Sequence, residues 1–169
     1  IEHSGAGWTL FATAGRTPGA LCRAKVAALG LVIAPAVACQ SLALIGWARL
    51  AGVAVPLDAG PWALYTAELI AVDLAMCAFH VWLAAVRENQ LIGVGVGLLG
   101  SFIAVYMLLA PSWVARLVPW GYYATICCVQ QRETDVQYTA PPLGWVAAFL
   151  VLAAVLFTVA TRRLDRIER

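Results

Sequence analysis

Long apolar stretches follow one another along the chain, separated by short segments that hold most of the charged residues. The four stretches run from Val26 to Ala48, Pro61 to Val86, Leu91 to Ala110 and Leu143 to Thr161. A helix rises about 1.5 Å per residue, so about 20 apolar residues cross the roughly 30 Å hydrocarbon core of a bilayer. The pattern therefore predicts four transmembrane helices.

Composition supports this prediction and excludes a soluble globular domain. Hydrophobic residues make up 63% of the 169 positions, and charged residues make up 12%, whereas a soluble domain carries about 25%. The formal net charge of +2 is too small to indicate a nucleic-acid partner. We therefore expect an all-α, polytopic membrane helical bundle in contact with lipid.

The distribution of basic residues predicts how the bundle lies in the membrane. If the N-terminus is cytoplasmic, eight Lys and Arg residues are inside and three are outside, which satisfies the positive-inside rule. The inside set is Arg16, Arg23, Lys25, Arg87, Arg162, Arg163, Arg166 and Arg169, and the outside set is Arg49, Arg116 and Arg132. Both visible termini are then cytoplasmic, in a multi-pass protein of the cell membrane.

Residues 111–142 are expected to be extracytoplasmic and to begin with an aromatic segment. Pro119 and Gly121 interrupt this segment too often for a fifth straight span. It is therefore interpreted as an interfacial or re-entrant element, followed by a polar loop. Its rings are expected at the outer membrane face, as in an aromatic belt. They are Trp113, Trp120, Tyr122 and Tyr123.

Polar residues within the apolar stretches are the best local candidates for function, because ionisable groups are costly at membrane depth. They are Gln40, Glu68, Asp73 and His80. Asp73 and His80 are seven positions apart, so they share a helix face, whereas Glu68 points elsewhere. Asp73 and Gln40 are expected at the same depth, with Asp73 hydrogen-bonded to Gln40, Ser41 or a partner subunit. Two roles are open for these polar residues. They could have a structural role facing other helices or a direct role in transport.

Known catalytic and nucleotide-binding motifs are absent from the sequence. The glycines at 95, 97 and 100 match a dinucleotide fingerprint literally, but they lie inside an apolar stretch instead of a βαβ unit. Gly93, Gly97 and Ser101 are instead expected to form a face for close helix packing. No P-loop occurs, and the five cysteines show no metal-ligand spacing. We therefore expect no catalytic residue, no metal site and no cofactor in this chain.

The adjacent Cys127 and Cys128 are interpreted as packing or lipid contacts, with a redox or ligand role as the alternative. The chain starts with Ile1, and we expect that its natural N-terminus lies upstream. Residues 1–25 are interpreted as a cytoplasmic segment. Within it, a helix around Gly7 to Ala14 could lie on the membrane surface or dock a soluble partner.

Several short motifs, in their order, resemble a known transporter family. They are Glu2 with Gly7-Trp8, Arg23-Ala24-Lys25, Phe79-His80-Val81-Trp82-Leu83, the stretch from Glu88 to Gly95, and Val118 to Tyr123. This set resembles the membrane subunit of ABC-2 type transporters, particularly the small permeases of lantibiotic protection and peptide-antibiotic resistance.

This resemblance implies a bacterial permease in which the four visible helices are the last four of six. It implies a second permease subunit, identical or different, and ABC ATPase subunits that hold ATP and magnesium. Its cytoplasmic coupling helix would correspond to residues Trp8, Thr9, Leu10 and Phe11. The expected substrate is amphiphilic, with a lantibiotic or other peptide antibiotic favoured over another small molecule.

Two other functions are alternatives to this permease. The alternative from a different class is a membrane immunity protein that sequesters a toxin or partner without energy input. An intramembrane enzyme that uses Asp73 and His80 is disfavoured, because no second catalytic group is expected at matching depth.

Overall fold

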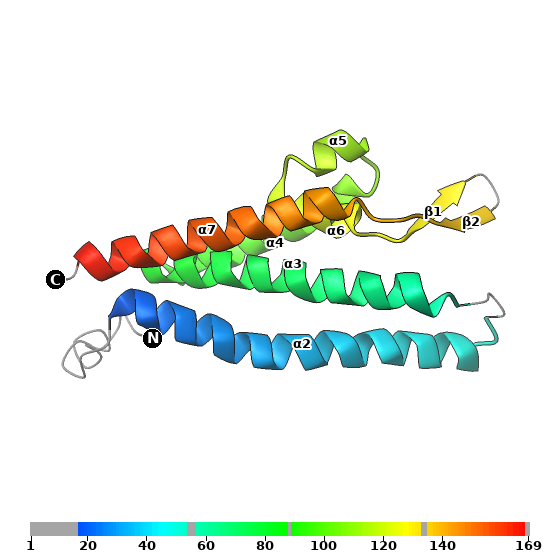
Figure 1. Cartoon of the computed structure of the whole chain (residues 1–169), viewed down its shortest axis with the longest axis horizontal. Helices are drawn as coiled ribbons and strands as arrows, with labels where there is room; N and C mark the ends of the chain where they lie inside the picture. Colours follow the sequence, from blue (N-terminus) through cyan, green and yellow to red (C-terminus); the bar gives the residue numbers. More distant parts are fainter. Residues whose placement is uncertain (1–16, 54–56, 88, 133–134, 168–169) are drawn as a thin grey trace.

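The computed structural model describes residues 17–53, 57–87, 89–132 and 135–167. Its long helices are α2 (Pro18–Leu50), α3 (Ala59–Val86), α4 (Gln90–Met107) and α7 (Leu143–Ile167). All four are long and apolar enough to cross a membrane (Figure 1). The prediction of a helical protein of membrane character is thus confirmed for the described part of the chain.

Helix α2 begins at Pro18, well before the predicted start at Val26. The Thr17 side chain accepts a hydrogen bond of 3.3 Å from the backbone N–H of Ala20, and Pro18 occupies the first turn. Both features favour a helix start, because they satisfy or remove N–H groups that lack a helical partner. The helix therefore begins before the predicted span, and Arg23 and Lys25 belong to α2.

Helix α3 ends at Val86 as predicted, whereas α4 and α7 match their apolar stretches more closely at their starts than at their ends. Helix α4 ends at Met107 instead of Ala110, and α7 continues beyond Thr161 to Ile167. The extension of α7 crosses Arg162 and Arg163, which are good helix formers. Hydropathy marks the edge of the membrane, and a helix can extend past that edge.

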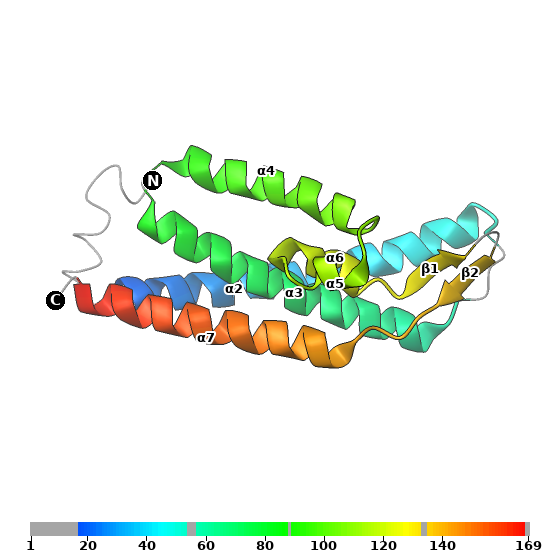
Figure 2. The same ribbon diagram turned by 90° about the horizontal axis from the view of Figure 1, so that it is seen from above.

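Helices α2, α3 and α7 contact one another, while α4 contacts α3 and the short helices that follow it. From above, α4 lies apart from α2 over most of its length (Figure 2). A small apolar core joins α3 and α7 to α6 (Tyr122–Thr125) and to the residue that follows it. Its buried members are Val72, Met76, Tyr122, Ile126 and Val146. The ring of Tyr122 stacks on Phe149 with centroids 4.1 Å apart.

The segment after α4 folds back onto the bundle and then leaves it as a hairpin. It contains α5 (Ser112–Ala115), the 3₁₀ helix η1 (Pro119–Gly121), α6, β1 (Val129–Arg132) and β2 (Asp135–Tyr138). The strands pair antiparallel, with Val129 opposite Tyr138. A short hairpin therefore stands where a polar loop was expected.

The ends of α2 and α7 are joined by a polar contact that we name the Asp165 junction. The Asp165 carboxylate accepts a 2.8 Å hydrogen bond from the backbone N–H of Gly19 and forms a 3.4 Å ion pair with Arg23. Arg23 also donates a 3.2 Å hydrogen bond to the buried hydroxyl of Thr161. A side chain at Gly19 would overlap the Thr161 carbonyl. Glycine thus permits the close approach of the two helices.

Candidate functional site

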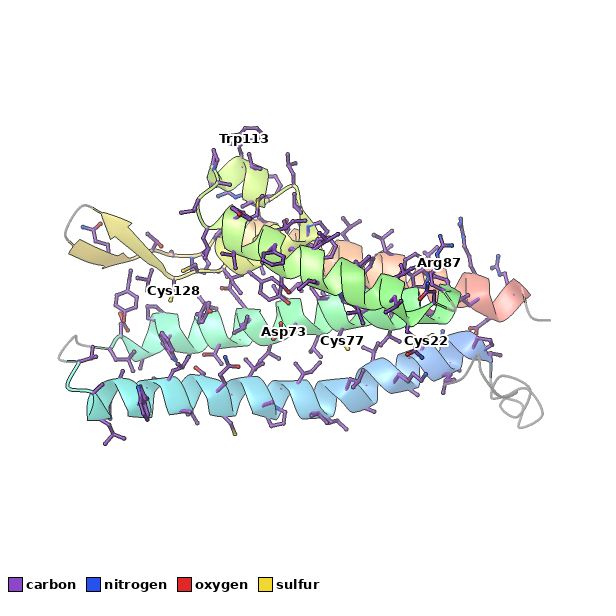
Figure 3. The ribbon with its side chains drawn as sticks, turned by 180° about the vertical axis from the view of Figure 1, so that it is seen from behind. Cys22, Asp73, Cys77, Arg87, Trp113 and Cys128 are labelled. Atoms are coloured by element: carbon purple, nitrogen blue, oxygen red, sulfur yellow. The ribbon has the colours of Figure 1, made fainter. Side chains whose placement is uncertain are left out.

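A cavity of about 730 Å³ lies between α2, α3, α4 and the segment that folds back. Its walls come from residues that share one face of each helix, at spacings of three, four and seven positions. From α2 they are Ile33, Ala36, Val37 and Gln40; from α3 they are Asp73, Met76, Cys77 and His80. The rest are Gly97, Ser101 and Ala104 of α4, with Trp120 and Tyr123. Figure 3 shows Asp73 and Cys77 on the side of α3 that faces α2.

Asp73 lies near the midpoint of α3 and is held by the aromatic segment. The hydroxyl of Tyr123 donates a 2.8 Å hydrogen bond to Oδ1 of Asp73. Burial, reinforced by this contact with Asp73, raises the pKa of Tyr123 above its ordinary value, so the phenol keeps its proton and remains a donor. The structure thereby places a carboxyl group and its hydrogen-bond donor in the wall of the cavity.

The expected bond from Asp73 to Gln40 or Ser41 is replaced by this contact with Tyr123. Gln40 does line the same cavity. The Ser41 hydroxyl instead lies 2.7 Å from the Thr66 hydroxyl and accepts a 2.7 Å hydrogen bond from Nε1 of Trp62. Equal depth along two helices was therefore insufficient to identify the partner, because the donor comes from a distant segment.

His80 lies two helical turns from Asp73 in the same cavity. A Cβ atom placed on Gly97 would lie 3.5 Å from Cε1 of His80, an ordinary van der Waals contact, so α4 packs beside the imidazole here. The ring of Phe79 packs edge-on against His80, with centroids 5.3 Å apart. The Ser101 hydroxyl donates a 2.9 Å hydrogen bond to the Gly97 carbonyl of its own helix. Small residues of α4 thus shape this wall of the cavity.

The close-packed face of α4 differs from the expected one at one glycine. A side chain at Gly93 would meet no atom of the described residues within 4 Å, whereas one at Gly100 would overlap the Trp120 ring. Gly97 and Gly100 are therefore the glycines with near neighbours, and Gly93 is open. The sequence pattern alone could not distinguish these glycines, because they all belong to the same repetitive stretch.

Glu68 lies outside the cavity, as its spacing from Asp73 indicated. Its side chain is 6% exposed, and neither carboxyl oxygen has a hydrogen-bond partner among the described residues. A carboxyl group in this environment is favoured in its neutral form, since burying an unpaired charge is costly. Glu68 is therefore a buried ionisable group between helices, and its structural or functional role stays a prediction.

A second cavity, of about 350 Å³, adjoins the first and shares Cys77 and His80 with it. Its other lining residues belong to the first turns of α2 and the last turns of α3, and they include Lys25. The two cavities extend from one end of the bundle to its middle. Cys77 lies where the two cavities meet. Chemical modification of its thiol can therefore measure access to both of them.

The four rings of the aromatic segment differ in their surroundings within the bundle. Trp113 is 65% exposed. Trp120 packs edge-on against Phe79 at 6.0 Å, and Tyr122 and Tyr123 contact the bundle. Trp120 and Tyr123 thus reach the middle of α4 and α3. The segment thus folds back onto the bundle, and its interfacial or re-entrant place in a membrane stays a prediction.

The proposed coupling residues, Trp8 to Phe11, lie outside the described residues. Among the described residues, no group of His, Cys, Asp and Glu could hold a metal ion. Neither Tyr123 as the Asp73 partner nor Cys77 as a cavity residue was predicted from the sequence. One sequence feature could have pointed to the contact between Tyr123 and Asp73. It is the interruption at Pro119 and Gly121, because it allows the chain to turn back.

Comparisons with known proteins do not place the chain in a family. No protein-family model, no curated protein and no solved structure matches it. The likeness to ABC-2 permeases consequently rests on the motifs of the chain itself.

Proposed function

We propose that this chain is a membrane permease subunit of an ATP-binding-cassette exporter that moves an amphiphilic substrate out of the membrane. The observation that carries the proposal is the cavity at the middle of the apolar helices, where Asp73, His80 and Gln40 face a common space. Ionisable groups at such depth are rare and mark transport paths more often than other positions do.

The size and lining of the cavity suit part of an amphiphile. Its volume of about 730 Å³ lies within the roughly 300–1,000 Å³ of ligand pockets. Apolar walls from Ile33, Val37 and Met76 would contact a hydrocarbon or side-chain surface, while Asp73 and Gln40 would contact a polar group. A lantibiotic or another peptide antibiotic is the favoured substrate, as the motif resemblance implies.

The proposed assembly includes a second permease subunit and separate ABC ATPase subunits that bind ATP and magnesium. The sequence has no P-loop, so energy would be supplied by those subunits. The bacterial cell membrane and cytoplasmic termini belong to the same proposal, supported by the bias of eight basic residues against three.

Affinity purification of the full-length protein from its native membranes tests the proposed partnership. We expect an ABC ATPase to co-purify in a mild detergent, and its hydrolysis to rise when an amphiphilic peptide is added. Trp8→Ala and Phe11→Ala should weaken the association while membrane insertion remains intact. Stoichiometric binding of the peptide without any ATPase would contradict the proposal and favour sequestration.

A further inference from the structure

The lining of the cavity that contains Asp73 has an acidic side chain and no basic Lys or Arg to balance it. Among its lining residues, Asp73 is the acidic group, and none is Lys or Arg. The other titratable side chains that face it are His80, Cys77 and Tyr123. A carboxylate in such surroundings gains from a positively charged partner, because no Lys or Arg among the lining residues compensates its charge.

The hydrogen bonding of Asp73 leaves one of its oxygens available. Tyr123 donates to Oδ1, and among the described residues no donor reaches Oδ2. The side chain is half-buried and lines the open space of the cavity. A ligand could therefore approach Oδ2 without breaking the contact between Tyr123 and Asp73.

The cavity wall also contains aromatic rings. Trp120 and Tyr123 line the same cavity, and aromatic faces attract organic cations within about 6 Å of the ring centre. The remaining walls are mostly aliphatic. A carboxylate, aromatic rings and an apolar groove form the combination that suits a cation attached to an apolar body.

We infer that Asp73, through Oδ2, binds a primary ammonium or guanidinium group of an amphiphile, whose apolar part lies along α2 and α4. This inference names the ligand class of the proposed permease site and rests on that proposed function. A proton on Asp73 is the competing occupant, since it would also remove the charge.

Cys77 provides the readout, because it lies one turn from Asp73 in the cavity wall. The full-length protein is placed in phosphatidylcholine nanodiscs, which contain no primary ammonium group, and N-ethylmaleimide modification is followed for each cysteine by peptide mass spectrometry. Exposed Cys39 of α2 lies outside both cavities and serves as the internal reference. The probes are dodecylammonium, neutral dodecanol and anionic dodecanoate at equal concentrations in the membrane.

Dodecylammonium should slow the modification of Cys77 about tenfold more than dodecanol does, a difference that corresponds to about 1.4 kcal/mol. Asp73→Asn should abolish this difference, and Asp58→Asn, at the exposed cap of α3, should preserve it.

Equal protection by all three probes, or a preference that survives in Asp73→Asn, would overturn the inference while leaving the proposed function intact. If none of the probes protects Cys77, the cavity does not admit amphiphiles. Both the inference and the proposed transport role of the cavity then fail.

Discussion

The indole ring of Trp120 in η1 occupies the space in which a side chain at Gly100 of α4 would lie. Gly100 is buried and sits near the middle of α4. The same short segment carries Tyr123 to Asp73, near the middle of α3. Two contacts thus hold the segment that folds back against the two helices, and they form one wall of the cavity.

Gly100→Ala should displace Trp120 and destabilise the fold by about 1–3 kcal/mol, the usual cost of adding atoms to a filled site. Gly95→Ala is the matched control, because a Cβ there would meet nothing within 4 Å among the described residues. Thermal unfolding in detergent, followed by tryptophan fluorescence, measures both. Similar midpoints for the two variants would show that Trp120 does not dock closely on α4.

Tyr123→Phe removes the hydroxyl that donates to Asp73 and leaves a half-buried carboxyl without that donor. In the absence of ligand, we expect a loss of about 1–3 kcal/mol in stability and faster maleimide modification of Cys77, because the cavity wall loosens. Tyr106→Phe, on the exposed face of α4, should change neither property. An unchanged rate at Cys77 would argue against a closing role for Tyr123.

Ser41→Ala tests the hydrogen bonds that connect α2 with α3. The Ser41 hydroxyl contacts both Thr66 and Trp62 of α3, and hydrogen bonds between membrane helices are worth about 0.6 kcal/mol on average. We expect a loss of about 1 kcal/mol from the two contacts together. Ser101→Ala removes a hydroxyl that bonds within its own helix, and it should have a smaller effect on the denaturation midpoint.

Asp165→Ala removes the acceptor that joins the first turn of α2 to α7. The lost bonds include those from the Gly19 N–H and the Arg23 guanidinium. Hydrogen bonds to a charged group near a helix N-terminus suggest a cost of about 1–2 kcal/mol, reduced by salt because Arg23 is partly exposed. Exposed Arg163→Ala is the control. A cost that does not change between low and high salt would indicate lost packing instead of electrostatics.

The sequence predicted the parts of this structure that depend on local pattern. Apolar stretches located the four long helices, since each stretch must be buried in lipid or protein along its whole length. The seven-residue spacing of Asp73 and His80 correctly placed both on one face, because a helix repeats that direction every two turns.

Contacts between residues far apart in the sequence could not be predicted from local pattern. Tyr123 is 50 positions from Asp73, and their contact depends on how the chain turns back after α4. Gly100 is closely packed and Gly93 is not, because the ring of Trp120 lies against Gly100. The position of Trp120 likewise depends on how the chain turns back. The Asp165 junction required knowing that α2 starts at Pro18 and that α7 extends past the apolar stretch.

The most direct test of the proposed permease is ATP-dependent movement of an amphiphilic peptide by the purified complex in proteoliposomes. Asp58→Asn is the matched control for Asp73→Asn, because Asp58 lies at the exposed cap of α3 and asparagine caps helices equally well. We predict that the unmodified complex and Asp58→Asn transport the peptide, while Asp73→Asn assembles normally and loses at least about tenfold in rate, or about 1.4 kcal/mol. Full transport by an assembled Asp73→Asn complex, or peptide binding with no ATP-dependent movement in any of the three, would contradict the account.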